Sequence, residues 1–345
     1  MRKHLFVSLI LIFLVFFIPW LSSGSVPQAQ ETPPQESVPV QPPPEENAEN
    51  LQPTPQRIPT GAWDGAMMIS VLLDGTVVEM DLGSYLIGVV RAEMPASFEL
   101  EALKAQAVAA RTYTLYKMAN GGSANHPDAD TCTDINCCKA YSSAEESAAL
   151  WGTAAAEYEE KIRSAVTATD GECVLYDGQP VLAVFHSSSA GMTMNAQDVW
   201  SGALPYLVSV SSPESADTVP NYHSSATFTT AALRTTLLNA LPEAQLSGSA
   251  SNWFTNLRQQ SNGTVTSLEV GGVAVTGNRL RTILGLRSAC FTLSFDGDSV
   301  TFSVVGYGHG VGMSQYGANV LAAGGMTYRE ILAWYYTNTT VGIAQ

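Results

Sequence analysis

The first 60 residues limit where this chain can fold. An apolar run from Leu5 to Leu21 opens the sequence. Residues 22–60 then contain 10 of the 18 prolines and five glutamates but almost no large apolar residue. Such a segment cannot bury enough surface to offset the entropy lost when it orders. The sequence therefore predicts a proline-rich tether at residues 22–60 and a folded part at residues 61–345.

The apolar run is typical of an export signal or a membrane anchor. Its 17 residues are preceded by Arg2 and Lys3, and roughly 17–25 apolar residues span a bilayer. Small residues at 22–25 would suit cleavage, so a cleaved signal peptide is the alternative. Because cleaved signals have only about 7–15 apolar residues, we predict a single-pass anchor at residues 1–21. Positive charge before the anchor places the rest of the chain outside the cell.

The charge balance excludes one class of partner. Acidic residues outnumber basic residues 31 to 16, and the net charge is -15 at pH 7. Nucleic acid as the main partner would require an excess of lysine and arginine to neutralise phosphates. We therefore predict no nucleic-acid partner, and we expect no electrostatic capture of an anionic wall polymer.

The folded part mixes two kinds of hydrophobic period. Two short apolar runs flank the turn signal Asp74-Gly75, and apolar residues recur at helical spacing before Pro95. This mixture predicts an α+β fold of helices and short strands. The predicted strands include residues 67–73, 76–80, 165–169, 173–176 and 180–186, and the predicted helices include residues 82–93, 98–118, 144–158 and 328–336.

Three segments carry more polar and charged functional groups than packing requires. Residues 85–95 contain Arg-Ala-Glu-Met-Pro and precede the helix that bears Arg111. Residues 185–207 begin Phe-His-Ser-Ser-Ser-Ala-Gly, and residues 308–318 read Gly-His-Gly-Val-Gly-Met-Ser-Gln-Tyr-Gly-Ala. In this order the segments resemble the stage II sporulation protein D family of peptidoglycan-remodelling proteins. The resemblance covers essentially all of residues 61–345.

The resemblance implies a lytic transglycosylase that cleaves peptidoglycan glycan strands, already stripped of stem peptides, during engulfment in sporulation. It implies two lobes flanking a cleft, with Glu93 as the catalytic acid/base. Implied protein partners are the sporulation amidase P and the membrane protein M. Another branch of the family suggests the alternative of a non-catalytic wall-binding module that enhances an amidase. For the transglycosylase, the predicted substrate-binding residues are Arg111, His186, Ser187, Ser188, Gln315 and Tyr316.

The residues around Glu93 agree with this role. Glu93 ends an apolar helix next to Met94 and Pro95, a setting that predicts a desolvated carboxyl with a raised pKa. One carboxyl suffices if it protonates the bridging oxygen and then accepts the proton of the sugar's own 6-hydroxyl. Glycosidases that use water need a second carboxyl about 5–9.5 Å away, and the motifs offer no second strong candidate. The alternative is a surface ion pair of Glu93 with Arg91 or Arg111.

One histidine and three cysteines fall within 13 residues, at His126, Cys132, Cys137 and Cys138. Nitrogen and sulfur donors suit tetrahedral Zn²⁺, and some members of the resembling family carry zinc in this insertion. We predict a structural zinc site, with the role of Cys137 left open because it adjoins Cys138. A disulfide between Cys132 and Cys138 is the alternative. A calcium loop is excluded because its glycine and terminal glutamate are missing.

Overall fold

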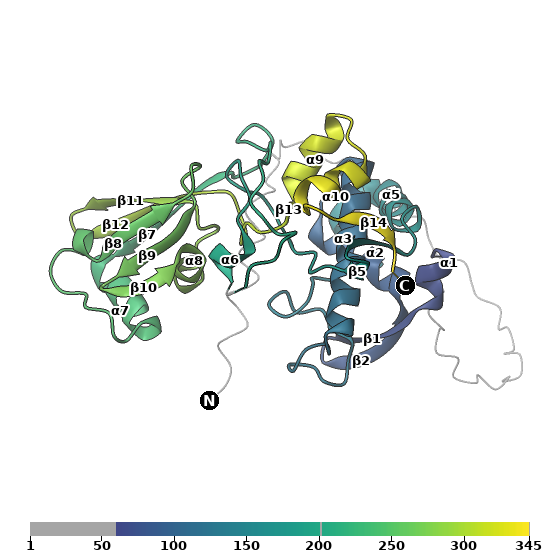
Figure 1. Cartoon of the computed structure of the whole chain (residues 1–345), viewed down its shortest axis with the longest axis horizontal. Coiled ribbons are helices and arrows are strands. Elements are labelled where there is room, and N and C mark those ends of the chain that lie inside the picture. The colour runs from purple at the N-terminus through teal and green to yellow at the C-terminus, as the bar shows by residue number, and fades with distance from the viewer. Residues whose placement is uncertain (1–59, 201, 345) are drawn as a thin grey trace, which may run out of the picture. The chain divides into compact units, whose positions relative to one another are not determined.

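The computed structural model describes residues 60–200 and 202–344, which Figure 1 shows in colour. The predicted anchor at residues 1–21 and nearly all of the tether at residues 22–60 lie outside the described residues, so both remain predictions. None of the described helices is both long enough and apolar enough to cross a membrane.

The described residues form an α+β fold with two separate hydrophobic cores, so the predicted fold class is confirmed. The first core is built around α3 (Leu100–Ala119), which packs against α2 (Leu82–Glu93), α5 (Ala155–Thr167), α9 (Gln315–Ala323) and α10 (Tyr328–Tyr335). Alanines fill much of the buried surface of α3, and their small side chains let these neighbours approach on several sides. The cleft between two lobes remains a prediction.

Short helices and three small sheets surround the first core. The sheets have the strand orders β2-β1-β3, β14-β4-β5 and β13-β6. The remaining elements of this part are α1 (Ala62–Ala66), β1 (Met68–Leu73), β2 (Thr76–Asp81), β3 (Thr131–Cys132), α4 (Ala144–Trp151), η2 (Gly152–Ala154), β4 (Glu172–Tyr176), β5 (Gln179–Pro180), β6 (Phe185–His186), α6 (Ala196–Val199), β13 (Met313–Ser314) and β14 (Thr340–Ile343).

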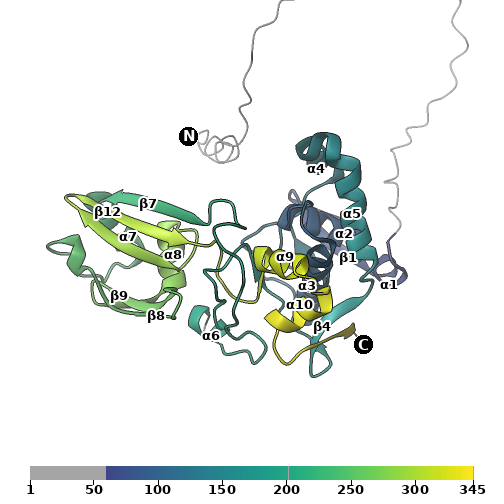
Figure 2. The same cartoon turned by 90° about the horizontal axis from the view of Figure 1, so that it is seen from above.

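The second core is built from residues 226–304 and centres on Phe302, whose ring contacts Phe228, Phe254 and Phe291. Two three-stranded antiparallel sheets, β10-β9-β8 and β11-β12-β7, enclose it. Helix α7 packs against β7 and β12 of one sheet, and α8 packs against β9 and β10 of the other (Figure 2). The elements are β7 (His223–Thr229), α7 (Thr230–Ala240), η3 (Ala250–Asn252), β8 (Phe254–Gln259), β9 (Val265–Val270), β10 (Val273–Thr276), α8 (Gly277–Leu284), β11 (Phe291–Asp296) and β12 (Ser299–Val305).

The predicted strands at residues 67–73 and 76–80 are confirmed as β1 and β2, but the strand predicted at residues 165–169 is wrong. Most of that stretch forms the last turn of α5. Its β-branched residues suggested a strand, yet Ile162, Ala165 and Val166 lie buried on one side of the helix. Packing of this apolar face on α3 outweighs the local strand propensity.

Candidate functional site

Glu93 is the last residue of α2 and its carboxylate is held by neutral donors. The backbone N–H of Ala140 donates to Glu93 Oε1 at 3.2 Å, and the Gln315 side chain also hydrogen-bonds the carboxylate. The two arginines considered as partners are engaged elsewhere. Arg91 Nε donates to Glu159 Oε2 at 2.8 Å, and Arg111 pairs with Asp64. The structure therefore does not show the alternative of a surface ion pair for Glu93.

Burial raises the pKa of Glu93 above the ordinary value for glutamate. The charge of Lys139 and the hydrogen bonds from Ala140 and Gln315 lower this pKa, but they do not cancel the effect of burial. Glu93 therefore keeps its proton to higher pH than an exposed glutamate. A general acid that works near neutral pH requires this property.

A close helix-to-loop contact positions the donor to Glu93. A Cβ on Gly88 would lie 2.1 Å from the Tyr141 ring, so only glycine lets residues 140–142 lie against α2. The N–H of Ser142 also donates to the Gly88 carbonyl at 3.0 Å. Gly88 thus fixes the segment that carries the Ala140 N–H.

Lys139 is a neighbour of Glu93 that the sequence did not single out as a site residue. Its ammonium lies 4.1 Å from the centre of the Tyr113 ring and 3.7 Å from that of Phe185, which stabilises a buried cation. Burial lowers the pKa of Lys139 to about 8, although the charge of Glu93 opposes this effect. The only hint in the sequence was that Lys139 directly follows Cys138, one of the predicted metal ligands.

The second and third motifs meet through a short parallel strand pair. Strand β13 pairs with β6, which sets Ser314 opposite His186. The N–H of Tyr316 donates to the Ser187 carbonyl at 3.0 Å, and Gln315 Nε2 donates to Gln106 Oε1 at 3.3 Å. Gln315 also contacts Glu93, so the structure brings the three motifs together. Their spacing along the sequence did not reveal this contact.

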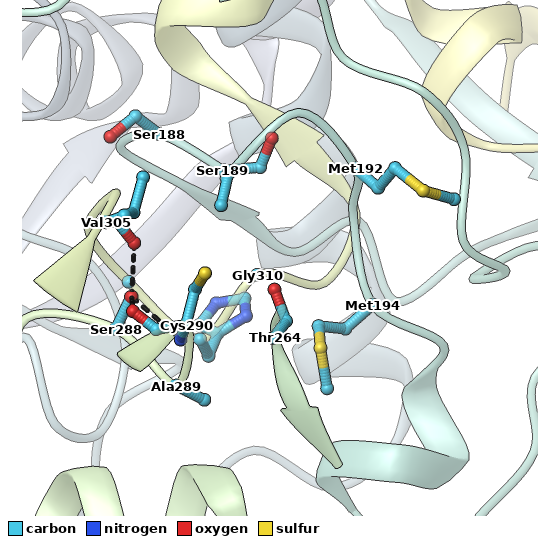
Figure 3. Close-up of a pocket in the computed structure, with 13 residues that line it drawn as sticks. Ser188, Ser189, Met192, Met194, Thr264, Ser288, Ala289, Cys290, Val305 and Gly310 are labelled. Atoms are coloured by element: carbon cyan, nitrogen blue, oxygen red, sulfur yellow. Dashed lines mark hydrogen bonds between the residues drawn. The ribbon is translucent and has the colours of Figure 1, made fainter. Parts of the chain in front are cut away.

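His186 and Ser188 are buried, with 4% and 2% of their surfaces exposed. Burial lowers the pKa of His186 to about 4, so its ring is neutral at pH 7. Ser188 borders a cavity of ≈ 20 Å³ that Ser288 and Thr264 also line (Figure 3). This volume fits about one water molecule. The cavity is too small for a sugar, and His186 does not line it. The substrate contacts predicted for His186 and Ser188 therefore stay predictions.

Glu214 organises the segment around these residues and was missed by the sequence reasoning. Only 3% of its surface is exposed. Its carboxylate accepts hydrogen bonds from Ser189 N at 2.6 Å and from the hydroxyls of Ser189, Ser212 and Ser314 at 2.8, 2.5 and 2.6 Å. These four donors satisfy the buried carboxylate. Because Ser189 belongs to the second motif and Ser314 to the third, Glu214 joins these two motifs. No local pattern distinguishes Glu214 from an exposed glutamate.

We expect Gly317→Ala to destabilise this arrangement by about 1–3 kcal/mol, the usual range for overpacking. A Cβ there would lie 2.1 Å from Tyr335 Oη, 2.4 Å from Ser212 Oγ and 2.6 Å from Glu214 Oε2. Urea unfolding measures the change. Gly202→Ala is the matched control because a Cβ at Gly202 meets no atom within 4 Å. Equal unfolding midpoints for both variants would contradict the described packing.

Arg111 does not join Glu93. Its guanidinium is fully buried and forms two hydrogen bonds to Asp64, at 2.8 Å from Nε to Oδ1 and 2.6 Å from Nη2 to Oδ2. A third donor, Nη1, reaches the Glu172 carbonyl at 3.0 Å. The structure thus gives Arg111 a role in packing α3 against α1 and β4, and we leave it out of the proposed substrate site.

The four predicted metal ligands lie together. Ligand atoms of His126, Cys132, Cys137 and Cys138 are all within 4.8 Å of one another, so the cluster could hold a metal ion. All five cysteines are free, so the alternative disulfide is not formed. The Sγ atoms of Cys137 and Cys138 are 3.9 Å apart, close to the roughly 3.8 Å expected for two thiolates on one tetrahedral zinc. Adjacent cysteines can therefore share a metal here.

The surroundings of the cluster orient its histidine. His126 Nδ1 lies 2.9 Å from the Ala129 carbonyl, to which it can donate, and Nε2 lies 3.2 Å from Cys138 Sγ. A proton on Nδ1 leaves the Nε2 lone pair free for a metal. Cys137 Sγ has Ser123 Oγ at 3.2 Å and receives a hydrogen bond from Asn125 Nδ2 at 3.6 Å.

Several known proteins are similar to this chain over most of its length. Residues 74–176 match the family described as Stage II sporulation protein. Stage II sporulation protein D of Bacillus subtilis (strain 168) is 36% identical over 302 residues, 88% of this chain and 83% of the relative. That of Bacillus amyloliquefaciens is 35% identical over 78% of this chain and 76% of the relative. An amidase enhancer of Bacillus subtilis (strain 168) is 30% identical over 74% of this chain and 40% of its own length. The chain belongs to the stage II sporulation protein D family of sporulation proteins.

Proposed function

We propose that this protein is a lytic transglycosylase that cleaves peptidoglycan glycan strands lacking stem peptides. The observation that carries this proposal is the state of Glu93. Its carboxyl is largely buried, has a raised pKa and is held by Ala140 and Gln315 rather than by an arginine. A carboxyl in this state can donate a proton and later accept one.

The proposed reaction uses Glu93 twice. The protonated carboxyl first gives its proton to the oxygen that bridges two sugars, and the bond to the N-acetylmuramic acid carbon breaks. The carboxylate then accepts the proton of the 6-hydroxyl of the same sugar, whose oxygen closes onto that carbon. The product is a 1,6-anhydro end, and Glu93 is again protonated. Lys139 lies close enough to stabilise the carboxylate between these steps.

Mass spectrometry of digested glycan tests the reaction type. Purified glycan strands without stem peptides should yield fragments that end in 1,6-anhydro-N-acetylmuramic acid. Fragments one water heavier would show a muramidase and would refute the proposal. Binding without fragments, together with faster cleavage by an added amidase, would favour the alternative of an amidase enhancer, which a relative's name suggests.

We further propose that the ion held by the His–Cys cluster is structural zinc. Ala140 follows Cys138 by two residues, so an ion there would fix the segment that donates to Glu93. Elemental analysis should find about one zinc per chain, as four nitrogen and sulfur ligands bind one ion. Cys132→Ser should lose most of the zinc, whereas Cys290→Ser, which changes a buried cysteine outside the cluster, should retain it. Retention by Cys132→Ser would exclude the assignment.

The proposed setting is the outer face of the cell membrane during sporulation engulfment, with residues 1–21 as the anchor. The proposed protein partners are the sporulation amidase P and the membrane protein M. An amidase that strips stem peptides would supply the substrate proposed here. Crosslinking of the full chain in sporulating cells would test both partners.

A further inference from the structure

One face of the sheet β11-β12-β7 carries an array of hydroxyl groups. In each strand alternate residues point into the second core, and the others point away from it. The register aligns the outward residues in rows across the three strands. The first two rows consist of Thr292, Ser303 and Ser225, and of Ser294, Thr301 and Thr227.

The third row contains Asp296, Ser299 and Thr229, so eight of the nine side chains are serine or threonine. We call these nine residues the hydroxyl face. Neighbouring strands lie about 4.8 Å apart and rows repeat about every 6.8 Å. The face therefore presents donors and acceptors on a regular grid.

Few of these hydroxyls form hydrogen bonds to other groups of the protein. Thr227 and Thr301 hydrogen-bond one another at 2.9 Å, and Thr229 accepts from the N–H of Ala232. Among the described residues, the hydroxyls of the first row have no protein partner, and all three residues are exposed. Threonine is enriched in strands but serine is not, so strand propensity accounts for the four threonines of the face and not for its four serines. Free hydroxyls on an exposed sheet are available to a ligand.

A hollow of ≈ 500 Å³ adjoins the first row. All three side chains of that row line it, and His223 adds an imidazole. Asn262 also lines it, but its amide already hydrogen-bonds Ala190, Met192 and Thr264. The apolar part of the lining includes Phe291, Val304 and Val305. This volume lies within the roughly 300–1,000 Å³ of ordinary ligand sites. The hollow extends the hydroxyl face into a concave site whose polar groups are mostly uncharged.

The chemistry of the hydroxyl face selects among classes of ligand. It contains no lysine or arginine, which nucleic acid would require. Its nine residues include no aromatic or large aliphatic side chain, which a protein interface or a lipid surface would need. Its hydroxyls instead match the hydroxyl and acetamido groups of sugars, because a hydroxyl both donates and accepts hydrogen bonds. Phe291, Val304 and Val305 in the adjoining hollow offer apolar contact to a sugar ring.

We propose that the hydroxyl face and its hollow bind N-acetylglucosamine units of a glycan strand, as a site additional to the one at Glu93. The choice of amino sugar rests on the proposed function, whereas the preference for neutral, hydroxyl-rich sugar units follows from the face itself. Binding at two sites of one chain increases the affinity for long strands over short ones. The face would thus hold long strands while Glu93 cleaves them.

The test measures binding of the neutral hexamer of N-acetylglucosamine to the full chain by calorimetry. All proteins carry Glu93→Gln, which removes turnover without touching the hydroxyl face. The variant Thr292→Val, Ser303→Ala, Ser225→Ala should bind about 100-fold more weakly, since three hydrogen bonds of about 1 kcal/mol each are lost. Valine keeps the shape and strand propensity of threonine. The matched control Thr235→Ala, Ser247→Ala, Ser251→Ala removes exposed hydroxyls elsewhere and should bind normally.

Amide chemical shifts give a second readout. Hexamer titration should shift resonances of β11, β12, β7 and Asn262 in the Glu93→Gln protein, and the triple variant should lose these shifts. Unchanged affinity in the triple variant, or no binding by the Glu93→Gln protein, overturns the inference. Because binding is measured without cleavage, a protein that binds through this face but yields no anhydro products refutes the transglycosylase alone.

Discussion

Replacing Glu93 with glutamine is expected to slow release of anhydro-ended glycan by about 10²–10⁴-fold, the range typical for loss of a general acid/base. The change is nearly isosteric, and glutamine can still accept the hydrogen bond from the Ala140 N–H. It also removes a carboxyl whose pKa burial raises, so folding should not suffer. Mass spectrometry of time-resolved digests measures the rate, and thermal unfolding confirms that the variant is folded.

Glu99→Gln is the matched control. Glu99 is exposed at the start of α3, where its backbone N–H rather than its carboxyl contacts Asn319, at 2.8 Å. The control should cleave at the wild-type rate. If Glu93→Gln also cleaves at that rate, Glu93 is not the catalytic acid/base.

The direction of the Glu93 pKa shift sets the pH dependence of the same reaction. The proton donor is present below the pKa of Glu93 and is lost as pH rises through it. Because this pKa is raised, cleavage should persist to higher pH than an ordinary glutamate would allow. Lys139→Met removes a charge that lowers the pKa of Glu93, so it should move the alkaline limb of the kcat/KM profile further upward. An unchanged limb would show that another group controls it.

Replacing Arg111 with methionine is expected to destabilise the fold by about 3–5 kcal/mol, because it leaves Asp64 as a buried carboxylate without its charged partner. Both side chains are fully buried, and two hydrogen bonds join them. Asp64 also accepts from the Gly171 N–H at 3.4 Å, which replaces little of the lost interaction. The urea midpoint should fall accordingly, and activity should fall with the folded fraction rather than through KM.

Arg329→Met provides the comparison. Arg329 pairs with Glu172, but about half of its side chain is exposed, and exposed pairs contribute about 0–1 kcal/mol. A folded Arg111→Met protein of normal stability with a raised KM would restore Arg111 to the substrate site and contradict the packing role.

The sequence motifs located the central residue of the candidate site but not its surroundings. Helical spacing and Pro95 predicted that Glu93 ends a helix, and the structure agrees. The contacts that hold Glu93 come from Ala140 and Gln315, which lie 47 and 222 residues further along the chain. Hydrophobic periodicity reports which face of an element is buried, not which distant loop meets it.

The metal cluster shows the same division. The sequence showed that His126 and the three cysteines offer nitrogen and sulfur ligands, because metal preference depends on the type of ligand atom. Whether Cys137 and Cys138 can face one ion is a question of backbone geometry, and the structure answers it with close Sγ atoms. Whether the cysteines form a disulfide or could hold a metal likewise depends on the distances between their sulfur atoms, which the sequence does not give.

Composition and motifs by themselves determined the α+β class and the family and predicted the role of Glu93, since these depend on local pattern and residue type. Only the tertiary structure decided that Arg111 is a buried packing residue, that Glu214 joins two motifs, and that hydroxyls from three strands form one face. Each of these features arises where segments far apart in the chain meet. Burial and register then give an ordinary residue its partner, and no local window of the sequence contains that partner.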